Sequence, residues 1–586
     1  MRPAVQKLFA TVIPLLLICV CVRATPYHVP VTFAITTNTT VGQSIFVIGS
    51  VAQLGNWQPT NAIKLVPSNC NSSNCLWSIT LGLPEGIIYE YKFVKRDDCV
   101  TCLSNNANVV WEPGPNRTNS TPAGPAAPII GKSIFYFSGW ANPSIIYANS
   151  SGTFTSKVMT AFAPGRTAGE KIWHADGLNF PGQTNFTFTF SDNSGHFDNP
   201  DGVAGRNYDT PLDAFVVQDG QIFNYWPAAT IAAPWVETFS STPTNGIQSR
   251  TVRVYLPRGF TNNVTKRYPV LYMNDGQNLF LGQGNFGGWN ADTNATYLIR
   301  YGKMRELIIV GIDNTSDRTC EYNPCNLNTC GASNSLAPRY IDYVINQLKP
   351  YIDTQYPTTA GRTLTNADNT GIVGSSRGGL CAAWFGWDRS DIFHKLGGLS
   401  PSFWGCDTTK NNLAVGPKHP VRIYLDSGTI GDFPITDPVC NPCFDGEAQT
   451  YAARDNLLNN GYILNVDLYH WISYGDQHNE FYWNRRLPVC YQFLFPTTDE
   501  PNTILETVSP LRITGFQLTN NNFTVTWPSF QARIYSLLGC SNLEDNISNW
   551  NTLYTAPSET RPWNTLTAPP TNGFRFFRVM ETAAPY

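Results

Sequence analysis

The chain has 586 residues, of which 14% are charged, and its formal net charge at pH 7 is −3. Because a single hydrophobic core stops growing near about 250 to 300 residues, a chain of this length divides into several domains. The low net charge argues against a nucleic-acid partner, since a protein that binds nucleic acid presents a strongly basic face.

The N-terminus has the pattern of a cleaved secretory signal. Two basic residues precede an apolar run from Leu8 to Val22, and Ala24 follows with the small side chain that a signal peptidase prefers. We therefore predict a signal peptide over residues 1–24 and a secreted, extracellular product without membrane attachment after cleavage. The alternative is an uncleaved anchor, but the run is shorter than the about 20 apolar residues that a spanning helix needs.

The cysteines suit an oxidising compartment. Several form close pairs or clusters: Cys70 with Cys75, Cys99 with Cys102, Cys440 with Cys443, and Cys320, Cys325 and Cys330. In a secreted protein such spacings favour loop-closing disulfides, with a four-cysteine zinc site from the first two pairs as the alternative. Removing the signal leaves an odd number of cysteines, and Cys381 is the candidate for a buried free thiol. Sequons such as the one at Asn185 indicate glycosylation.

Short strands dominate the first 245 residues. Residues 25–140 alternate apolar and polar positions between Gly, Asn and Pro turns, which is the pattern of an antiparallel β-sandwich. Residues 141–245 are also rich in strand-like segments and show no helical periodicity. We predict a β-rich connecting region there and assign it no function.

The pattern changes near Arg250, where continuous apolar strands begin to alternate with amphipathic helices. This alternation predicts a mostly parallel sheet over residues 246–500, with helices on both faces and a ligand site beyond the carboxyl ends of the strands. Residues 501–586 return to short strands and predict a small C-terminal β-sandwich. The predicted fold is therefore multidomain, with an α/β domain between β-sandwiches.

The segment "VGSSRGG" lies between an apolar strand and an apolar helix, which is the setting of a nucleophile elbow. We predict Ser376 as a nucleophile, with the amide of Arg377 directed at the developing oxyanion from the helix N-terminus. Gly374 and Gly378 suit a sharp turn where the backbones of strand and helix approach closely.

A serine hydroxyl needs a base that removes its proton, and a carboxylate that orients the base. His478 follows the last predicted strand of the α/β domain, where the base is expected. The preceding strand offers two acids, Asp426 on the strand and Asp432 in the loop beyond it. We favour Asp432, because a loop carboxylate can reach the far side of an imidazole. The order serine, aspartate, histidine is that of the α/β-hydrolases.

Six segments between residues 245 and 497 together resemble the esterase family that includes enterochelin esterases, esterase D, feruloyl and acetylxylan esterases and mycolyltransferases. They are "YPVLYMNDGQNLF", "IIVGIDNT", "EYNP", "VGSSRGG", "LDSGTIGD" and "HNEFYWNRRLP". The resemblance implies Ser376, Asp432 and His478 as the catalytic residues and implies neither a metal nor an organic cofactor.

The same resemblance implies that the backbone of Gly276 and Gln277 gives the second oxyanion donor. We expect Asp275 and Glu321 to support their loops rather than to touch substrate. Trp404 and Trp483 either line a pocket for an acyl group or sugar or belong to the core, which is the commoner place for an aromatic side chain. These alternatives stay open on the sequence alone.

Three segments of the N-terminal sandwich, "GSVAQLGNWQP", "YEYKFVK" and "VVWEPGPNR", resemble the starch-binding domain, the family 20 carbohydrate-binding module. The resemblance implies a stacking platform of Trp57 and Trp111, with Lys92 and Asn116 as hydrogen-bonding partners of the sugar. The alternative is that both tryptophans are core residues. Asn116 also begins a sequon, and a glycan there would obstruct the predicted site.

These features predict a secreted serine esterase that binds starch or a related α-glucan and hydrolyses carboxylic esters, expected on carbohydrate, through an acyl-serine intermediate. The main alternative is a non-catalytic glucan-binding or cell-wall protein with an inactive hydrolase domain. A glycoside hydrolase fits less well, because that chemistry generally needs two facing carboxylates and the sequence offers a serine elbow instead.

Overall fold

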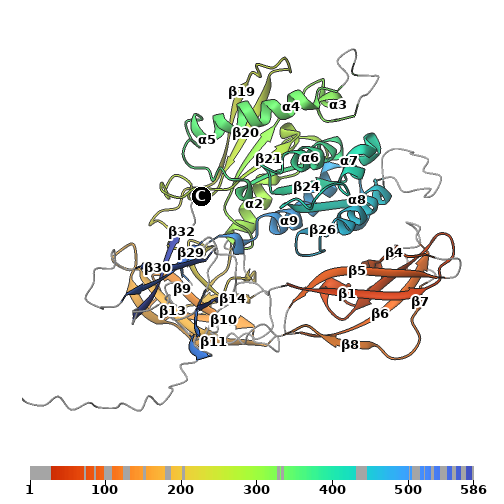
Figure 1. Cartoon of the computed structure of the whole chain (residues 1–586). Helices are drawn as coiled ribbons and strands as arrows, with labels where there is room; N and C mark the ends of the chain where they lie inside the picture. The colour runs from red at the N-terminus through yellow and green to blue at the C-terminus, as the bar shows by residue number, and fades with distance from the viewer. Residues whose placement is uncertain are drawn as a thin grey trace, which may run out of the picture.

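The structure is a computed structural model of the chain (Figure 1). It describes residues 28–70, 74–84, 87–97, 109–122, 132–148, 153–178, 186–200, 205–325, 330, 335–430, 445–500, 502–504 and six strands between 515 and 583. The predicted signal peptide lies outside the described residues. Within these ranges, no helix is both long and apolar enough to cross a membrane.

The N-terminal module, residues 28–122, consists of two antiparallel sheets, as predicted. One has the order β1-β5-β4; the other has the order β3-β2-β6-β7, with β8 also paired to β6. The strands are β1 (His28–Thr37), β2 (Gln43–Gly49), β3 (Ile63–Lys64), β4 (Val66–Ser68), β5 (Cys75–Pro84), β6 (Ile88–Asp97), β7 (Val110–Trp111) and β8 (Arg117–Ser120). Two 3-10 turns, η1 (Ala52–Leu54) and η2 (Pro59–Asn61), follow β2. Alternate residues of β2, Ile45 and Val47, face the core between the sheets.

A second β domain follows, with a core of its own rich in aromatic side chains, among them Phe188, Phe190 and Phe215. Its sheets have the orders β11-β10-β14-β15, with β16 beside β14, and β12-β13-β9-β17-β18. The strands are β9 (Lys132–Ser138), β10 (Ser144–Ala148), β11 (Phe154–Val158), β12 (Thr160–Pro164), β13 (Lys171–Leu178), β14 (Phe186–Ser191), β15 (Phe197–Asp198), β16 (Tyr208–Thr210), β17 (Ala214–Gln218) and β18 (Gln221–Phe223). β9 lies within the segment that we assigned to the N-terminal sandwich, yet it pairs with β13 and β17.

The α/β domain, residues 235–500, is built on an eight-stranded sheet of order β19-β20-β22-β21-β23-β24-β25-β26. β19 and β20 are antiparallel to their neighbours, and every later pairing is parallel, which confirms the predicted mostly parallel α/β sheet. The strands are β19 (Trp235–Ser241), β20 (Arg250–Leu256), β21 (Val270–Asn274), β22 (Ile308–Ile312), β23 (Thr370–Ser375), β24 (Lys395–Leu399), β25 (Arg422–Ile430) and β26 (Leu468–Gln477).

Helices cover both faces of this sheet (Figure 1). They are α2 (Ala291–Arg300), α3 (Arg318–Glu321), α4 (Ala337–Tyr343), which continues through the π-helical η7 (Val344–Leu348) into α5 (Lys349–Thr354), α6 (Ser376–Asp388), α7 (Asp407–Asn412), α8 (Glu447–Asn459) and α9 (Glu480–Leu494). The 3-10 turns are η4 (Gly276–Asn278), η5 (Asn285–Gly287), η8 (Ala367–Asn369), η9 (Phe403–Gly405) and η10 (Thr497–Asp499). On β21, Leu271 and Met273 pack with α2 and α9, whereas Val270 and Tyr272 belong to the core on the opposite face. Because side chains alternate between the two faces of a strand, apolar residues on β21 pack against helices on both faces of the sheet.

The described strands of the C-terminal segment form two three-stranded antiparallel sheets, β27-β28-β31 and β30-β29-β32. They are β27 (Gly515–Thr519), β28 (Asn522–Pro528), β29 (Arg533–Cys540), β30 (Asn551–Ala556), β31 (Trp563–Ala568) and β32 (Phe576–Ala583). That the two sheets pack as a sandwich stays a prediction.

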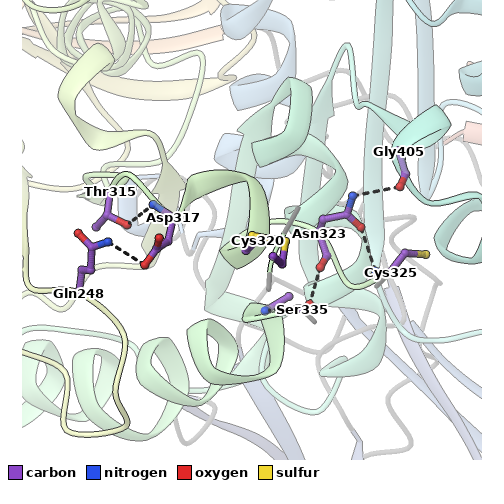
Figure 2. The surroundings of a disulfide bond; sticks show 10 residues. Gln248, Thr315, Asp317, Cys320, Asn323, Cys325, Ser335 and Gly405 are labelled. Carbon is purple, nitrogen blue, oxygen red and sulfur yellow. Dashed lines mark hydrogen bonds between the residues drawn. A yellow bond between two sulfur atoms is a disulfide. The ribbon is translucent and has the colours of Figure 1, made fainter. Parts of the chain in front are cut away.

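Disulfides join Cys70 to Cys75, Cys320 to Cys330, and Cys325 to Cys406. The first bond removes two ligands from the alternative zinc site. The third spans 81 residues and ties the segment after α3 to the segment after β24. Close to Cys325, Asn323 also donates to the carbonyl of Gly405 at 3.0 Å, a hydrogen bond that Figure 2 shows. Cys381 is free and buried, as predicted. The pairs Cys99/Cys102 and Cys440/Cys443 lie outside the described residues.

Candidate active site

Ser376 stands at the turn between β23 and α6, where its backbone has a left-handed φ of 53°. Few residues with a side chain adopt this conformation, which costs roughly 1 to 3 kcal/mol. The neighbouring glycines are required by space: a Cβ at Gly374 would lie 2.3 Å from the carbonyl oxygen of Gly378, and one at Gly378 would lie 2.9 Å from Oδ2 of Asp275. The strained turn predicted from the sequence is therefore present, and it presents a hydroxyl at the carboxyl end of the sheet.

Ser376 Oγ lies 3.2 Å from Oγ of Ser402, in the segment after β24. Arg377 occupies the first turn of α6, where backbone N–H groups have no partner within the helix. The N-terminus of this helix therefore offers an amide donor and a positive dipole end beside the Ser376 hydroxyl.

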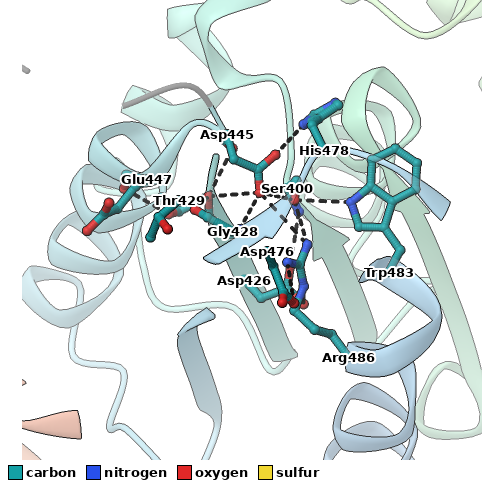
Figure 3. Close-up of polar contacts among 12 residues, drawn as sticks. Ser400, Asp426, Gly428, Thr429, Asp445, Glu447, Asp476, His478, Trp483 and Arg486 are labelled. Carbon is teal, nitrogen blue, oxygen red and sulfur yellow. Dashed lines mark hydrogen bonds and ion pairs between the residues drawn. The ribbon is translucent and has the colours of Figure 1, made fainter. Parts of the chain in front are cut away.

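His478 immediately follows β26, and its Nδ1 is hydrogen bonded to Oδ1 of Asp445 (Figure 3). The Asp445 side chain has no exposed surface, and 10% of the His478 side chain is exposed. A carboxylate can only accept, so the proton of this hydrogen bond sits on Nδ1 and the lone pair of Nε2 is left for another proton. This arrangement is that of an oriented general base.

The second oxygen of Asp445 is held by Ser400, directly after β24, and by Gly428 on β25. Oδ2 accepts from Ser400 Oγ at 2.7 Å and from the backbone N–H of Gly428. Ser400 Oγ in turn accepts from Nη2 of Arg486 at 2.7 Å and from Nε1 of Trp483 at 3.1 Å. One hydroxyl donates once and accepts twice, so Ser400 is saturated and the Asp445 carboxylate has a fixed orientation.

Arg486 is the cation at the centre of this network, and its side chain is fully buried. Its guanidinium lies 3.2 Å from Asp426, 3.3 Å from Asp476 and 3.9 Å from Asp445. Burial alone would lower the pKa of Arg486, but the surrounding carboxylates raise it above its ordinary value. The guanidinium therefore stays charged and balances the buried carboxylates.

Asp426, the alternative acid of the sequence analysis, does not contact His478. Its oxygens accept from the Tyr424 hydroxyl at 2.7 Å and from the Ser400 backbone N–H at 3.1 Å. Burial raises the pKa of Asp426 to about 6, against the opposing effect of Arg486. We conclude that Asp426 supports the strand ends.

Asp432, the acid that we favoured, lies outside the described residues, and the carboxylate that contacts His478 is Asp445. Asp445 was not among the acids predicted from the sequence, because the prediction was limited to carboxylates close to the end of β25. Asp445 comes 15 residues after Ile430, directly before the Gly446 that precedes α8. A carboxylate next to a helix start was the signal that could have identified it.

The loop after β21 lies against the elbow. Nδ2 of Asn274 donates to the carbonyl of Gly378 at 2.8 Å, and η4 begins directly after Asp275. The Asp275 carboxylate is bound by Arg318 at 2.6 and 2.8 Å, and Oε1 of Gln277 accepts from the backbone of Asn314 at 3.0 Å. Both side chains are thus turned into the scaffold.

The N–H groups of Gly276 and Gln277 stand in the first turn of η4, where they have no partner within the turn. Glu321, like Asp275, supports its surroundings, as expected: it pairs with Arg250 at 2.6 Å, and both side chains are fully buried.

The two tryptophans differ in role. Trp483 is 5% exposed, belongs to the core under α9 and donates to Ser400, so it supports the network. Trp404 is half-buried, and its ring centroid lies 5.9 Å from that of His478. The Trp483 ring centroid lies closer to that of His478, at 5.1 Å, so exposure rather than distance distinguishes Trp404 as the more accessible of the two side chains.

In the N-terminal module, the ring centroids of Trp57 and Trp111 lie 6.4 Å apart with an interplanar angle of 40°. Trp111 is 41% exposed and Trp57 is half-buried, so neither is a core residue. Lys92 Nζ donates to the carbonyls of Glu112 at 3.0 Å and Gly114 at 2.5 Å. Nδ2 of Asn116 donates to Glu90 at 2.9 Å. Trp57 and Trp111 therefore lie beside each other, while Lys92 and Asn116 bond to groups on and next to β6 and β7 of the same sheet.

The α/β domain and the N-terminal module each match a known protein family. Residues 245–492 match the family model described as "Putative esterase", and residues 28–128 match the model described as "Starch binding domain". The chain thus carries an esterase-family α/β-hydrolase domain together with an N-terminal starch-binding domain.

Curated relatives match the starch-binding region. An alpha-amylase from Streptomyces violaceus is 43% identical over 91 residues, which are 16% of this chain and 14% of that protein. A family AA13 lytic polysaccharide monooxygenase from Aspergillus terreus is 38% identical over 96 residues, 16% of this chain and 22% of that protein. The chain therefore spans less than a quarter of the length of either relative.

Two solved structures are similar to this chain over different shares of its length. A ferulic acid esterase is 19% identical, with 45% of this chain and 98% of that chain covered and a TM-score of 0.34. The enterobactin esterase of Shigella flexneri is 15% identical, with 81% of this chain and 95% of that chain covered and a TM-score of 0.33.

The raised pKa of Asp426 predicts a pH-dependent stability difference. A carboxyl whose pKa is higher in the folded state than in the unfolded chain contributes stability that is lost as the pH rises through the folded value. With a folded pKa of about 6 and an ordinary value of 3.8, wild type should lose about 2 to 3 kcal/mol of unfolding free energy relative to Asp426→Asn between pH 4 and pH 7.

Urea denaturation of both proteins across this pH range measures the difference. The control is Asp391→Asn, an exposed carboxyl whose pKa is lowered by hydrogen bonding to Arg389, so that its stability difference does not fall with pH. A wild-type-minus-Asp426→Asn difference that is constant or rises with pH would contradict the assignment of Asp426.

Proposed function

We propose that this chain is a serine esterase that hydrolyses carboxylic esters of carbohydrate while bound to starch or a related α-glucan. The observation that carries the proposal is the His478–Asp445 pair, fixed by Ser400 and Gly428, in a domain whose strained elbow presents Ser376. The match of residues 245–492 to an esterase family supports the same chemistry.

In the proposed reaction, Nε2 of His478 removes the proton of Ser376 Oγ as this oxygen attacks the acyl carbonyl. The new C–O bond turns the carbonyl oxygen into an oxyanion, which accepts from the backbone N–H of Arg377 and from the N–H groups at Gly276 and Gln277. Collapse of the tetrahedral intermediate breaks the ester bond, and the protonated imidazole gives its proton to the leaving sugar oxygen. A water molecule then attacks the acyl-serine by the same steps and releases the carboxylic acid.

Asp445 takes the place of the acid in this mechanism. Its buried carboxylate keeps the Nδ1–H tautomer of His478 and stabilises the imidazolium that forms when the base accepts a proton. Arg486 supplies the countercharge, and Ser400 fixes the carboxylate oxygen that does not face the histidine. The function of these two residues is to position Asp445.

The N-terminal domain is proposed to bind the polysaccharide. Sugars expose apolar C–H faces that stack on aromatic rings, and polar groups nearby bind the hydroxyls. Trp57 and Trp111 provide the rings, while Lys92 and Asn116 lie beside them. The match to the starch-binding family supports an α-glucan as the ligand.

The catalytic assignment predicts covalent labelling by a fluorophosphonate probe. Wild type should react, whereas Ser376→Ala and His478→Ala should not, because one lacks the attacking oxygen and the other lacks its base. Asp445→Asn should lower kcat for p-nitrophenyl acetate by about 10⁴-fold, since the amide favours the wrong tautomer of His478.

Asp432→Asn is the matched control, because it removes a carboxylate from the same stretch of sequence between β25 and α8, and it should react close to the wild-type rate. Circular dichroism of every variant checks the fold. Loss of activity in Asp432→Asn with Asp445→Asn active would reverse the assignment of the acid. A folded wild type that neither labels nor hydrolyses esters would leave a glucan-binding protein with an inactive hydrolase domain.

The binding assignment predicts that the chain pulls down with raw starch and that Trp57→Ala and Trp111→Ala each reduce the bound fraction at least about tenfold, because each removes a stacking surface. Phe154→Ala, which removes a 51% exposed aromatic side chain from the second β domain, is the control and should bind like wild type. Equal binding by all four proteins would place starch elsewhere on the chain.

A further inference from the structure

The starch-binding domain is joined to the hydrolase domain by direct contacts. The backbone N–H of Gly82, on β5, donates to the carbonyl of Leu464 at 2.8 Å, and Leu81 and Leu464 form an isolated parallel bridge. Nζ of Lys64, on β3, lies 5.0 Å above the ring of Tyr451 on α8. The domains therefore meet at defined atoms, and Figure 1 shows the N-terminal module beside the α8 and β26 end of the sheet.

These contacts fall on the elements that carry the acid and the base. Tyr451 belongs to α8, which begins two residues after Asp445, and Leu464 lies in the connection from α8 to β26. β26 is the edge strand of the sheet and ends directly before His478. Because Leu464 precedes the start of β26 and His478 follows its end, the starch-binding domain docks along this edge strand, beside the elements that lead to the candidate active site.

Tyr474 on β26 links the two sites. It packs against the apolar cluster of Phe46, Ile48 and Val94 on the outer face of the β2-β6 sheet. Trp57 packs against the same cluster, and Trp111 lies beside Trp57. An aromatic side chain of the hydrolase domain therefore shares its support with the stacking platform of the other domain, and it is half-buried rather than enclosed.

Tyr474 and His478 are separated by only a short stretch of chain. Four residues lead from Tyr474 to His478, and a fully extended chain of that length spans at most about 14 Å. The chain itself therefore keeps Tyr474 and the candidate base His478 close together, without any movement of the domains.

We propose that Tyr474 continues the platform of Trp57 and Trp111 onto the hydrolase domain, and that the ester cleaved at Ser376 is carried by the same α-glucan chain that the platform holds. This inference rests on the proposed function and specifies its substrate as an O-acylated α-glucan. The group that leaves Ser376 in the first half-reaction is then a glucan hydroxyl.

Kinetics of the full chain on two esters test the inference. Acetylated maltoheptaose spans the platform and the active site, whereas p-nitrophenyl acetate reaches only the active site. For Tyr474→Ala, the ratio of kcat/KM on the first ester to kcat/KM on the second should fall about tenfold relative to wild type, as expected for the loss of one stacking contact. Tyr474→Phe keeps the ring and should restore most of the ratio.

The matched control is Tyr297→Ala, which removes a 45% exposed tyrosine from α2 and should keep the wild-type ratio. Calorimetric titration gives a second measurement. Tyr474→Ala should weaken the binding of maltoheptaose more than that of maltose, because only the longer ligand extends beyond the two tryptophans. A purely structural role of Tyr474 would not produce this dependence on ligand length.

An unchanged ratio in a folded Tyr474→Ala protein, or an equal loss on both esters, would overturn the inference while leaving the esterase intact. Wild type that hydrolyses p-nitrophenyl acetate but shows no preference for acetylated maltoheptaose would also overturn it. Wild type that is inactive on both esters would overturn the proposed function, and the inference with it.

Discussion

The candidate active site depends on one constraint: a carboxylate with no exposed surface has to stay charged and keep its direction. Asp445 meets it through hydrogen bonds from Ser400 and Gly428 and through the buried Arg486 3.9 Å away. An unpaired buried charge costs several kcal/mol, so these groups cannot be removed singly without penalty. The ends of β24 and β25 and the start of α9 all contribute to this support, which explains why the carboxyl ends of these strands are so polar.

The sequence predicted the architecture better than the details of the site. Continuous apolar strands and the glycines around Ser376 depend on neighbouring residues in the sequence, so both could be recognised from it. The structure has the mostly parallel sheet and the strained elbow. The partner of His478 was not predictable in the same way. The sequence from Ile430 to Asp445 contains several carboxylates, and spacing along the chain does not decide which one meets the histidine. Likewise, the pattern of β9 reveals a strand but not the sheet that it joins.

The contact between the two domains suggests that the starch-binding region does more than hold the chain on its polymer. A domain on a flexible tether raises the local concentration of a polymer without directing any bond to the active site. Here Gly82 and Lys64 meet the elements that flank Asp445 and His478. Under the proposal for Tyr474, binding and catalysis share one surface, and the choice of substrate depends on both domains rather than on the hydrolase domain alone.

The central claim is that Ser376 forms an acyl intermediate. Its most direct test is to quench the wild-type chain during hydrolysis of p-nitrophenyl acetate, measure the intact mass, and map the modified peptide by mass spectrometry. The account predicts a single acetyl group on Ser376 that disappears as hydrolysis is completed. An acetyl group on another residue, or steady hydrolysis by Ser376→Ala at the wild-type rate, would contradict it.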